Sequence, residues 1–205
     1  ANLQFVDRSN VNSKFNVDRD MGIQLHGKYK LGESFIIAPK FAVSQGEGRD
    51  ISSGNYGGLS YTGRLDVLPL GAFEGKKQDY ILSDHTRQSK PKLSIGLFGN
   101  LNQGAVRQQG QLGSFVYDTT GEYAENDLTL LGADLLFKVK GFSFLSEFGM
   151  TEGDMKNDLL SKGYHTGTGF NAQAGYLFES NVELAGRYTN VKPDDEAFSG
   201  LKDTE

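Results

Sequence analysis

The chain contains no cysteine and no tryptophan, and only four of its 205 residues are proline. The absence of cysteine excludes a disulfide framework, a thiolate metal site and a cysteine nucleophile. No run of about 18 apolar residues occurs. This excludes a transmembrane helix but leaves a transmembrane β-barrel open, because barrel strands show only alternation. A net charge of −5 argues against nucleic acid as a partner.

The residues that are abundant suit a folded protein rich in strands. Hydrophobic residues make up 37% of the chain and charged residues 23%, which excludes a disordered protein. The 27 glycines and the scattered tyrosines and phenylalanines are typical of many strands joined by turns. The first methionine is Met21 and no signal peptide is present, so we expect that processing or truncation removed the start of the precursor.

Alternation of apolar and polar residues predicts eight β-strands. Between residues 21 and 30, for example, Met21, Ile23 and Leu25 alternate with Gly22 and Gln24, which is the period of a strand with two different faces. Most of the strands are about ten residues long, the length that crosses a bilayer at a tilt. The predicted strands are 21–30, 34–44, 59–68, 92–102, 128–139, 142–150, 169–178 and 182–190.

One of these segments also allows a helix. Residues 127–139 read DLTLLGADLLFKV and place Leu128, Leu131 and Leu135 at helical spacing. Gly132 and Val139 lower the helix propensity of the segment. We therefore predict a strand there and keep the helix as the alternative.

The lengths of the connections follow a pattern along the chain. Three are tight, at 31–33, 140–141 and 179–181, and three are long and polar, at 45–58, 103–127 and 151–168. They alternate so that the tight turns share one rim of an antiparallel sheet and the long loops share the other. The exception is 69–91, which is long but falls on the rim of the tight turns. Long external loops and short periplasmic turns are typical of bacterial outer-membrane barrels.

The more apolar face of the eight predicted strands carries no charged residue. A charge on a lipid-facing position costs about 2–4 kcal/mol at mid-bilayer, but a soluble core would exclude charge as well. The two hypotheses differ in what covers that face. A soluble sandwich would place Leu65, Leu97 and Phe144 beneath a second protein layer, whereas a membrane barrel would leave them uncovered.

Aromatic residues on this face bracket the tight turns. They indicate an aromatic girdle at a membrane interface, although aromatic packing at strand ends would give the same pattern. The girdle predicted in this way consists of Tyr29, Phe35, Phe137, Phe142 and Phe178.

The opposite face is mixed and carries more cations than anions. Cations that face a confined passage raise the local concentration of anions, so this face suggests an anion-attracting lumen. The alternative is cross-strand pairing, for example of Arg64 with Asp66 and its neighbours, which would only neutralise an inner wall. Leu130, Leu136 and Leu145 fit a wet lumen poorly. The predicted lumen-lining cations are Lys28, Lys30, Lys40, Arg64, Lys92, Lys138 and Arg187, and the anions are Asp66, Asp134, Glu147 and Glu183.

No arrangement of residues suggests an enzyme. His26, His85 and His165 are far apart and lack a zinc-site spacing. Residues 83–85 read Ser-Asp-His, but neighbours in sequence do not have the geometry of a catalytic triad, and a turn is the simpler reading. We expect no catalytic residue, no metal and no cofactor.

Several stretches resemble the phosphate-selective porin O and P family of outer-membrane channels. They are FVDRSNVNSKFNVDRDMGIQLHG (5–27), YTGRLDVLPLGAFEG (61–75), LSDHTRQSKPKLSIGLFGNLNQGAVRQQGQLG (82–113) and LLGADLLFKVKGFSFLSEFG (130–149). The resemblance implies a barrel of about sixteen strands, usually trimeric, that passes anions. It also implies a long 69–91 connection on the periplasmic side.

Together these observations predict an all-β chain in which residues 1–205 form a single β-barrel domain in the Gram-negative outer membrane. Because eight strands close only a barrel filled by its own side chains, we expect a partial barrel with strands missing at one or both ends. The expected function is a porin for passive diffusion of small solutes, with membrane lipid and small anions as partners. The alternatives are a structural barrel platform in an envelope or secretion complex, and a soluble all-β binding module.

Overall fold

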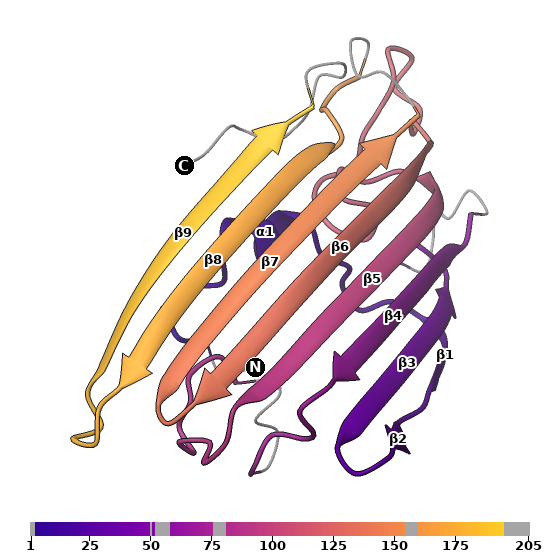
Figure 1. Cartoon of the computed structure of the whole chain (residues 1–205). Helices are drawn as coiled ribbons and strands as arrows, with labels where there is room; N and C mark the ends of the chain where they lie inside the picture. The colour runs from indigo at the N-terminus through magenta and orange to yellow at the C-terminus, as the bar shows by residue number, and fades with distance from the viewer. Residues whose placement is uncertain (1–2, 50, 52–57, 76–80, 155–159, 195–205) are drawn as a thin grey trace.

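The computed structural model describes residues 3–49, 51, 58–75, 81–154 and 160–194, and its main feature is one nine-stranded antiparallel sheet (Figure 1). The strands pair in the order β1-β3-β4-β5-β6-β7-β8-β9, and β2 pairs with β3 beside β1. The sheet does not close on itself, so β1 with β2 forms one edge and β9 the other. The strands are β1 (Gly22–His26), β2 (Tyr29–Leu31), β3 (Phe35–Ser44), β4 (Ser60–Leu68), β5 (Lys92–Ala105), β6 (Asn126–Val139), β7 (Phe142–Gly153), β8 (Gly167–Leu177) and β9 (Glu183–Pro193).

All eight predicted strands are confirmed, including the segment that also allowed a helix. Residues 126–139 form β6, which pairs with β5 on one side and β7 on the other. Leu130 and Leu136 are buried, whereas Leu131 between them is 48% exposed. The leucines therefore follow the two-residue period of a strand with different faces, and the helical spacing of three of them is incidental.

The strand predicted at 21–30 is interrupted opposite Pro39, which accounts for nine strands in place of eight. Gln24 pairs with Ala42 in β1, and Tyr29 pairs with Ile37 in β2, so the register is the same on both sides of the break. Gly27 N–H donates to Pro39 O at 3.0 Å. Proline has no N–H to return that bond, so the ladder fails there and a single strand becomes two.

The two faces of the sheet differ in what covers them. The outer face, which carries Leu65, Leu97 and Phe148, has no second protein layer over it in the described part of the chain. Leu97 is 54% exposed, Leu65 is 38% exposed and Phe144 is half-buried. The inner face, which carries Leu130, Leu136 and Asn171, is covered by the chain's own loops and by the N-terminal residues.

The described part contains a single α-helix, α1 (Asn10–Lys14), which lies against β7, β8 and β9 on the inner face (Figure 1). Ser9 caps it, because its side chain accepts a hydrogen bond from Asn12 N–H. No described helix is long and apolar enough to cross a membrane.

Three small hydrophobic clusters line the inner face, and they explain the leucines that fit a wet lumen poorly. Leu130 packs with Val11 and Phe15 of the N-terminal segment. Leu136 and Leu145 pack with Phe73 of the 69–91 connection. These leucines are buried because inward-folded segments of the chain cover them. The third cluster, at the long-loop end, contains Ala105, Val116, Ala124, Leu128 and Tyr164.

The 69–91 connection, the exception among the loop lengths, is docked on the short-turn rim. Asp84 is fully buried, and its carboxylate accepts hydrogen bonds from Gln88 N–H and, at 2.8 Å, from Gly141 N–H. The Arg87 guanidinium donates to the carbonyls of Leu177 and Phe178 at the end of β8. The described part of this connection, 69–75 and 81–91, thus ties two of the tight turns together.

Candidate functional site

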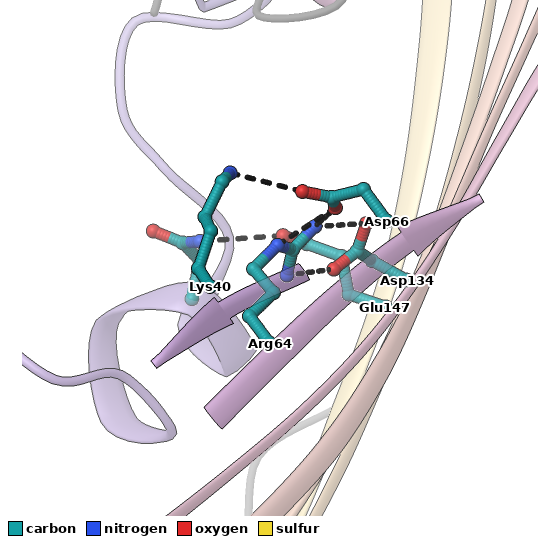
Figure 2. Close-up of polar contacts among 6 residues, drawn as sticks. Lys40, Arg64, Asp66, Asp134 and Glu147 are labelled. Carbon is teal, nitrogen blue, oxygen red and sulfur yellow. Dashed lines mark hydrogen bonds and ion pairs between the residues drawn. The ribbon is translucent and has the colours of Figure 1, made fainter. Parts of the chain in front are cut away.

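The charged residues predicted to share one face do share it, and the central ones form a single ion-pair network (Figure 2). Arg64 on β4 makes a two-pronged contact with Asp134 on β6, at 2.7 and 3.0 Å. Arg64 also contacts Asp66 at 2.7 Å, and Lys40 on β3 contacts Asp66 at 2.9 Å. Two cations therefore face two carboxylates, which is the cross-strand pairing that the sequence left open as the alternative.

Gly96 on β5 makes this network possible, and sequence reasoning did not single it out for this role. It pairs in register with Asp66 of β4 on one side and with Asp134 of β6 on the other, so the Arg64 side chain passes above it to reach Asp134. A Cβ at Gly96 would lie 2.3 Å from Arg64 Nη2 and 2.6 Å from Asp134 Oδ1. The missing side chain thus lets an arginine of one strand reach an aspartate two strands away.

The Glu147 carboxylate lies beside the network but is bound by neutral donors. It accepts from Ser9 Oγ at 2.8 Å, from Asn12 Nδ2 at 3.3 Å and from Asn171 Nδ2 at 2.9 Å. These donors come from the N-terminal residues and from β8. Glu147 therefore adds a negative charge to the wall and at the same time holds the segment that covers it.

The remaining predicted lumen cations are dispersed over the inner face. Lys28 and Lys30 are exposed near the β1–β2 edge. Lys92 Nζ donates to Leu70 O at 3.2 Å. Lys138 is fully buried, with its Nζ 5.4 Å from the centre of the Phe73 ring.

Arg187 and Glu183, at the β9 end of the inner face, contact the N-terminal residues. The Arg187 guanidinium lies 4.2 Å from the centre of the Phe5 ring and donates to Asp7 O at 3.0 Å. Glu183 accepts from Gln4 Nε2 at 2.6 Å and from Ser83 Oγ at 2.8 Å. Ser83 and Asp84 are thus used in docking a loop, and their neighbour His85 completes no triad.

Arg64 lines three cavities that open between the N-terminal residues and the inner face. Their volumes are about 380, 230 and 460 Å³. Lys40 lines the first and the third, and Lys28 lines the third together with Asp66 and Glu147. The first and third cavities adjoin β1, β3 and β4, and the second and third extend over β5, β6 and β7.

The predicted girdle aromatics lie on the outer face at the strand ends beside the tight turns. Tyr29 is 56% exposed and Phe178 is 45% exposed, and Phe35 and Phe142 are also exposed. Phe137 is half-buried, and its ring centre lies 6.3 Å from that of Phe142 across the turn. Tyr176, which the sequence analysis did not include, stacks edge-on against Phe178 at 5.0 Å.

The apolar band of the outer face is bounded by the aromatic residues at the tight turns and by charged residues at the long-loop end. The sequence analysis missed the second of these boundaries. Asp127, Glu152 and Lys192 occupy outward positions of β6, β7 and β9 at the long-loop end, as their pairing with outward neighbours shows. The signal was present in the alternation, but it lay beyond the predicted strand ends. Between these charges and the tight turns, β6 presents Thr129, Leu131, Ala133, Leu135, Phe137 and Val139 to the outside, and β7 presents Phe142, Phe144, Ser146, Phe148 and Met150.

Within the described ranges, no group of three or more histidines and carboxylates gathers in a way that could hold a metal ion. Comparison of the chain with protein-family models, with curated proteins and with solved structures found no match.

Proposed function

We propose that this chain forms part of the wall of a β-barrel in a Gram-negative outer membrane and acts as a porin for passive diffusion of small solutes. The observation that carries the proposal is the outer face. It is apolar, no layer of the described chain covers it, and charges bound it at the long-loop end while the aromatic residues lie at the tight-turn end. A bilayer is the environment in which a band of this kind is stable.

The outer face exposes large apolar side chains on neighbouring strands. Large side chains such as Leu97 and Phe148 are 54% and 44% exposed, and they belong to rows that run across all the strands. Contiguous apolar patches of more than a few hundred Å² mark a binding or membrane surface. This argues against the soluble binding module.

The open sheet edges bear on the completeness of the barrel. In hydrocarbon every backbone N–H and C=O must be paired, so an open edge is not stable there. Further strands between β9 and β1 are therefore part of the proposal. The sequence resemblance to the phosphate-selective porins supports a barrel of about sixteen strands that assembles as a trimer.

The anion preference expected from the sequence remains a prediction about specific residues. Lys40 and Arg64 are already paired with carboxylates, so their contribution to an anion-attracting field is reduced. Lys28 and Lys30 are exposed at the edge. We expect a weak preference for small anions.

Reversal-potential measurements on the reconstituted protein in a salt gradient test the pore and its preference together. We expect open-channel steps and a reversal potential whose sign indicates a preference for anions. Charge reversal at Lys28, Lys40 and Arg64 to glutamate should move that potential toward the cation side. Unchanged selectivity in all three variants would count against their lining the passage.

A second candidate function is a structural barrel that serves as a platform in an envelope complex. The inward-folded segments favour it, because they fill much of the space above the inner face with packed side chains such as Phe15 and Phe73. Protein that inserts into planar bilayers without open-channel steps would support the platform and reject the porin.

A further inference from the structure

Residues 3–20, here called the inner segment, lie along the inner face of the sheet before the chain enters β1 (Figure 1). The segment includes α1 and contacts β7, β8 and β9. It is held by a shaped groove, by apolar contacts and by polar bonds.

The groove is made by Gly149 on β7 and Gly169 on β8, and Gly132 on β6, whose missing side chain makes room for Phe98, continues the row. Gly132 pairs with Gly149, and Gly149 pairs with Gly169, so they form one row over β6, β7 and β8. Phe15 lies in this row: a Cβ at Gly149 would be 2.4 Å from Phe15 Cβ, and one at Gly169 would be 2.5 Å from Phe15 Cε2. Only residues without a side chain leave room for this ring.

Apolar contacts seal the groove from above. Val11 and Phe15 are each 3% exposed and pack with Leu130 and Val191 of the sheet. Burial of two side chains of this size is a large contribution for a segment of this length. The segment is therefore seated on this face by the same forces that hold a core.

Polar bonds hold the part of the inner segment that precedes Phe15. Ser9 and Asn12 donate to Glu147. Gln4 donates to Ser143 at 3.2 Å and accepts from Gln173 at 3.0 Å. These contacts join the segment to β7 and β8 at points between the glycine row and the tight turns, which fixes its direction along the sheet.

We propose that the inner segment is the resident constriction of the pore, confining the passage to the side of the lumen formed by β1, β3 and β4. This rests on the proposed function. The segment packs on the inner side of β7 to β9, and the first and third cavities, of about 380 and 460 Å³, adjoin β1, β3 and β4. Asp18 and Asp20 of the segment line the first cavity opposite Lys40 and Arg64, so the segment supplies one wall and the sheet the other. Solute size is then limited by the segment as well as by the barrel.

The test displaces the segment by filling its groove. Gly149→Ala places a methyl group where Phe15 lies, and Phe15→Ala removes the same contact from the other partner without altering the sheet. Gly63→Ala is the matched control, since a Cβ there meets nothing within 4 Å. In both test variants the single-channel conductance should increase, and in the Gly63→Ala control it should not. Gly149→Ala should add nothing further in the Phe15→Ala background.

Thiol labelling shows whether the inner segment is docked on the sheet, independently of conduction. Single cysteines can be introduced for this purpose because the chain has no cysteine of its own. Val11→Cys should label slowly and Asn12→Cys fast, since Val11 is buried and Asn12 is exposed. Gly149→Ala should accelerate labelling at position 11 about tenfold or more.

The outcomes separate the two proposals. Equal labelling rates at positions 11 and 12 in otherwise unaltered protein would show that the inner segment is not docked on the sheet. That result would overturn the constriction as well. Faster labelling in Gly149→Ala with unchanged conductance, in a protein that conducts, would overturn the constriction alone. Slow labelling at position 11 in a protein that never conducts would overturn the proposed pore and the constriction but leave the seated segment intact.

Discussion

At the scale of single residues, sequence reasoning placed the charges on the correct face but did not determine their partners. Alternation is sufficient to put Arg64, Asp66 and Asp134 inside. It does not show that Gly96 lets Arg64 reach across a strand to Asp134, because pairing of that kind depends on register and on the absence of a side chain in the strand between.

The central network predicts the direction of a charge change. Asp134→Asn removes one carboxylate from Arg64, so the cation is less neutralised and the passage becomes more positive. In reversal-potential measurements the anion preference should rise by a factor of about two to three. Glu152→Gln, on the outer face, is the control and should leave the preference unchanged. An unchanged preference in Asp134→Asn would show that the network does not border the passage.

His165, in the loop before β8, predicts a dependence of stability on pH. Burial, with Lys14 as a second cause, lowers the pKa of this imidazole to about 4 from an ordinary 6.5. The unfolded chain therefore binds this proton more readily than the folded one. The stability associated with neutral His165 is complete above pH 6.5 and falls between pH 6.5 and 4, by up to about 3 kcal/mol.

Urea unfolding in detergent at pH 7.5 and pH 4.5 measures this effect. The unaltered protein should lose more stability on acidification than His165→Gln, in which the titrating group is absent. An equal loss in both proteins would show that His165 does not carry the pH dependence.

At the scale of elements, alternation predicted every strand but missed the break between β1 and β2 and the inward course of the N-terminal residues and of the 69–91 connection. The break depends on a proline in the neighbouring strand, so it is visible only once the pairing is known. The inward segments lack periodicity. The sequence indicated these segments only through Leu130, Leu136 and Leu145, because apolar residues on a polar face are stable when another part of the chain packs over them.

Pro39→Val should restore the ladder between β3 and the first strand. The new N–H at position 39 faces Gly27 O, so β1 and β2 should become one continuous strand. Hydrogen exchange at the position-39 amide should be as slow as at neighbouring strand amides, with a change in stability within about 1 kcal/mol. Exchange at the rate of an unpaired amide would contradict the account of the break.

The docked 69–91 connection predicts a large effect from one buried carboxylate. Asp84→Ala leaves Gln88 N–H and Gly141 N–H without their acceptor, which should lower the free energy of unfolding by about 2 kcal/mol or more. Ser89→Ala, at an exposed hydrogen bond in the same connection, should change it by less than about 0.5 kcal/mol. Similar losses in urea unfolding would mean that Asp84 does not anchor the rim.

At the scale of the whole molecule, the sheet has a bare apolar face and a polar face that the chain folds back to cover. Sequence alone could not decide between a soluble core and a membrane wall, because both exclude charge. The structure shows that Leu65 and Leu97 are not covered by the described chain, which is the observation on which the proposed membrane wall rests.

The apolar band of the outer face predicts that the free-energy cost of a charged substitution depends on its depth in the bilayer. Leu97→Arg, near the middle of the band, should destabilise the protein folded in lipid vesicles by about 2–4 kcal/mol. Thr129→Arg, which lies beside the charged boundary at Asp127 and Glu152, should cost about 0–1 kcal/mol. Heat-dependent gel mobility after folding into vesicles reports the difference, and equal costs would contradict the placement of the band.

The most direct test of the membrane assignment uses fluorescence, because the chain has no tryptophan. Single tryptophans at Leu97, Phe148 and Phe170 report on the outer face, and one at Gln24 reports on the inner face. In vesicles of lipids brominated on the acyl chains, emission from the three outer positions should be strongly quenched and emission from position 24 should not. Unquenched emission from the outer positions would contradict the contact between this face and lipid.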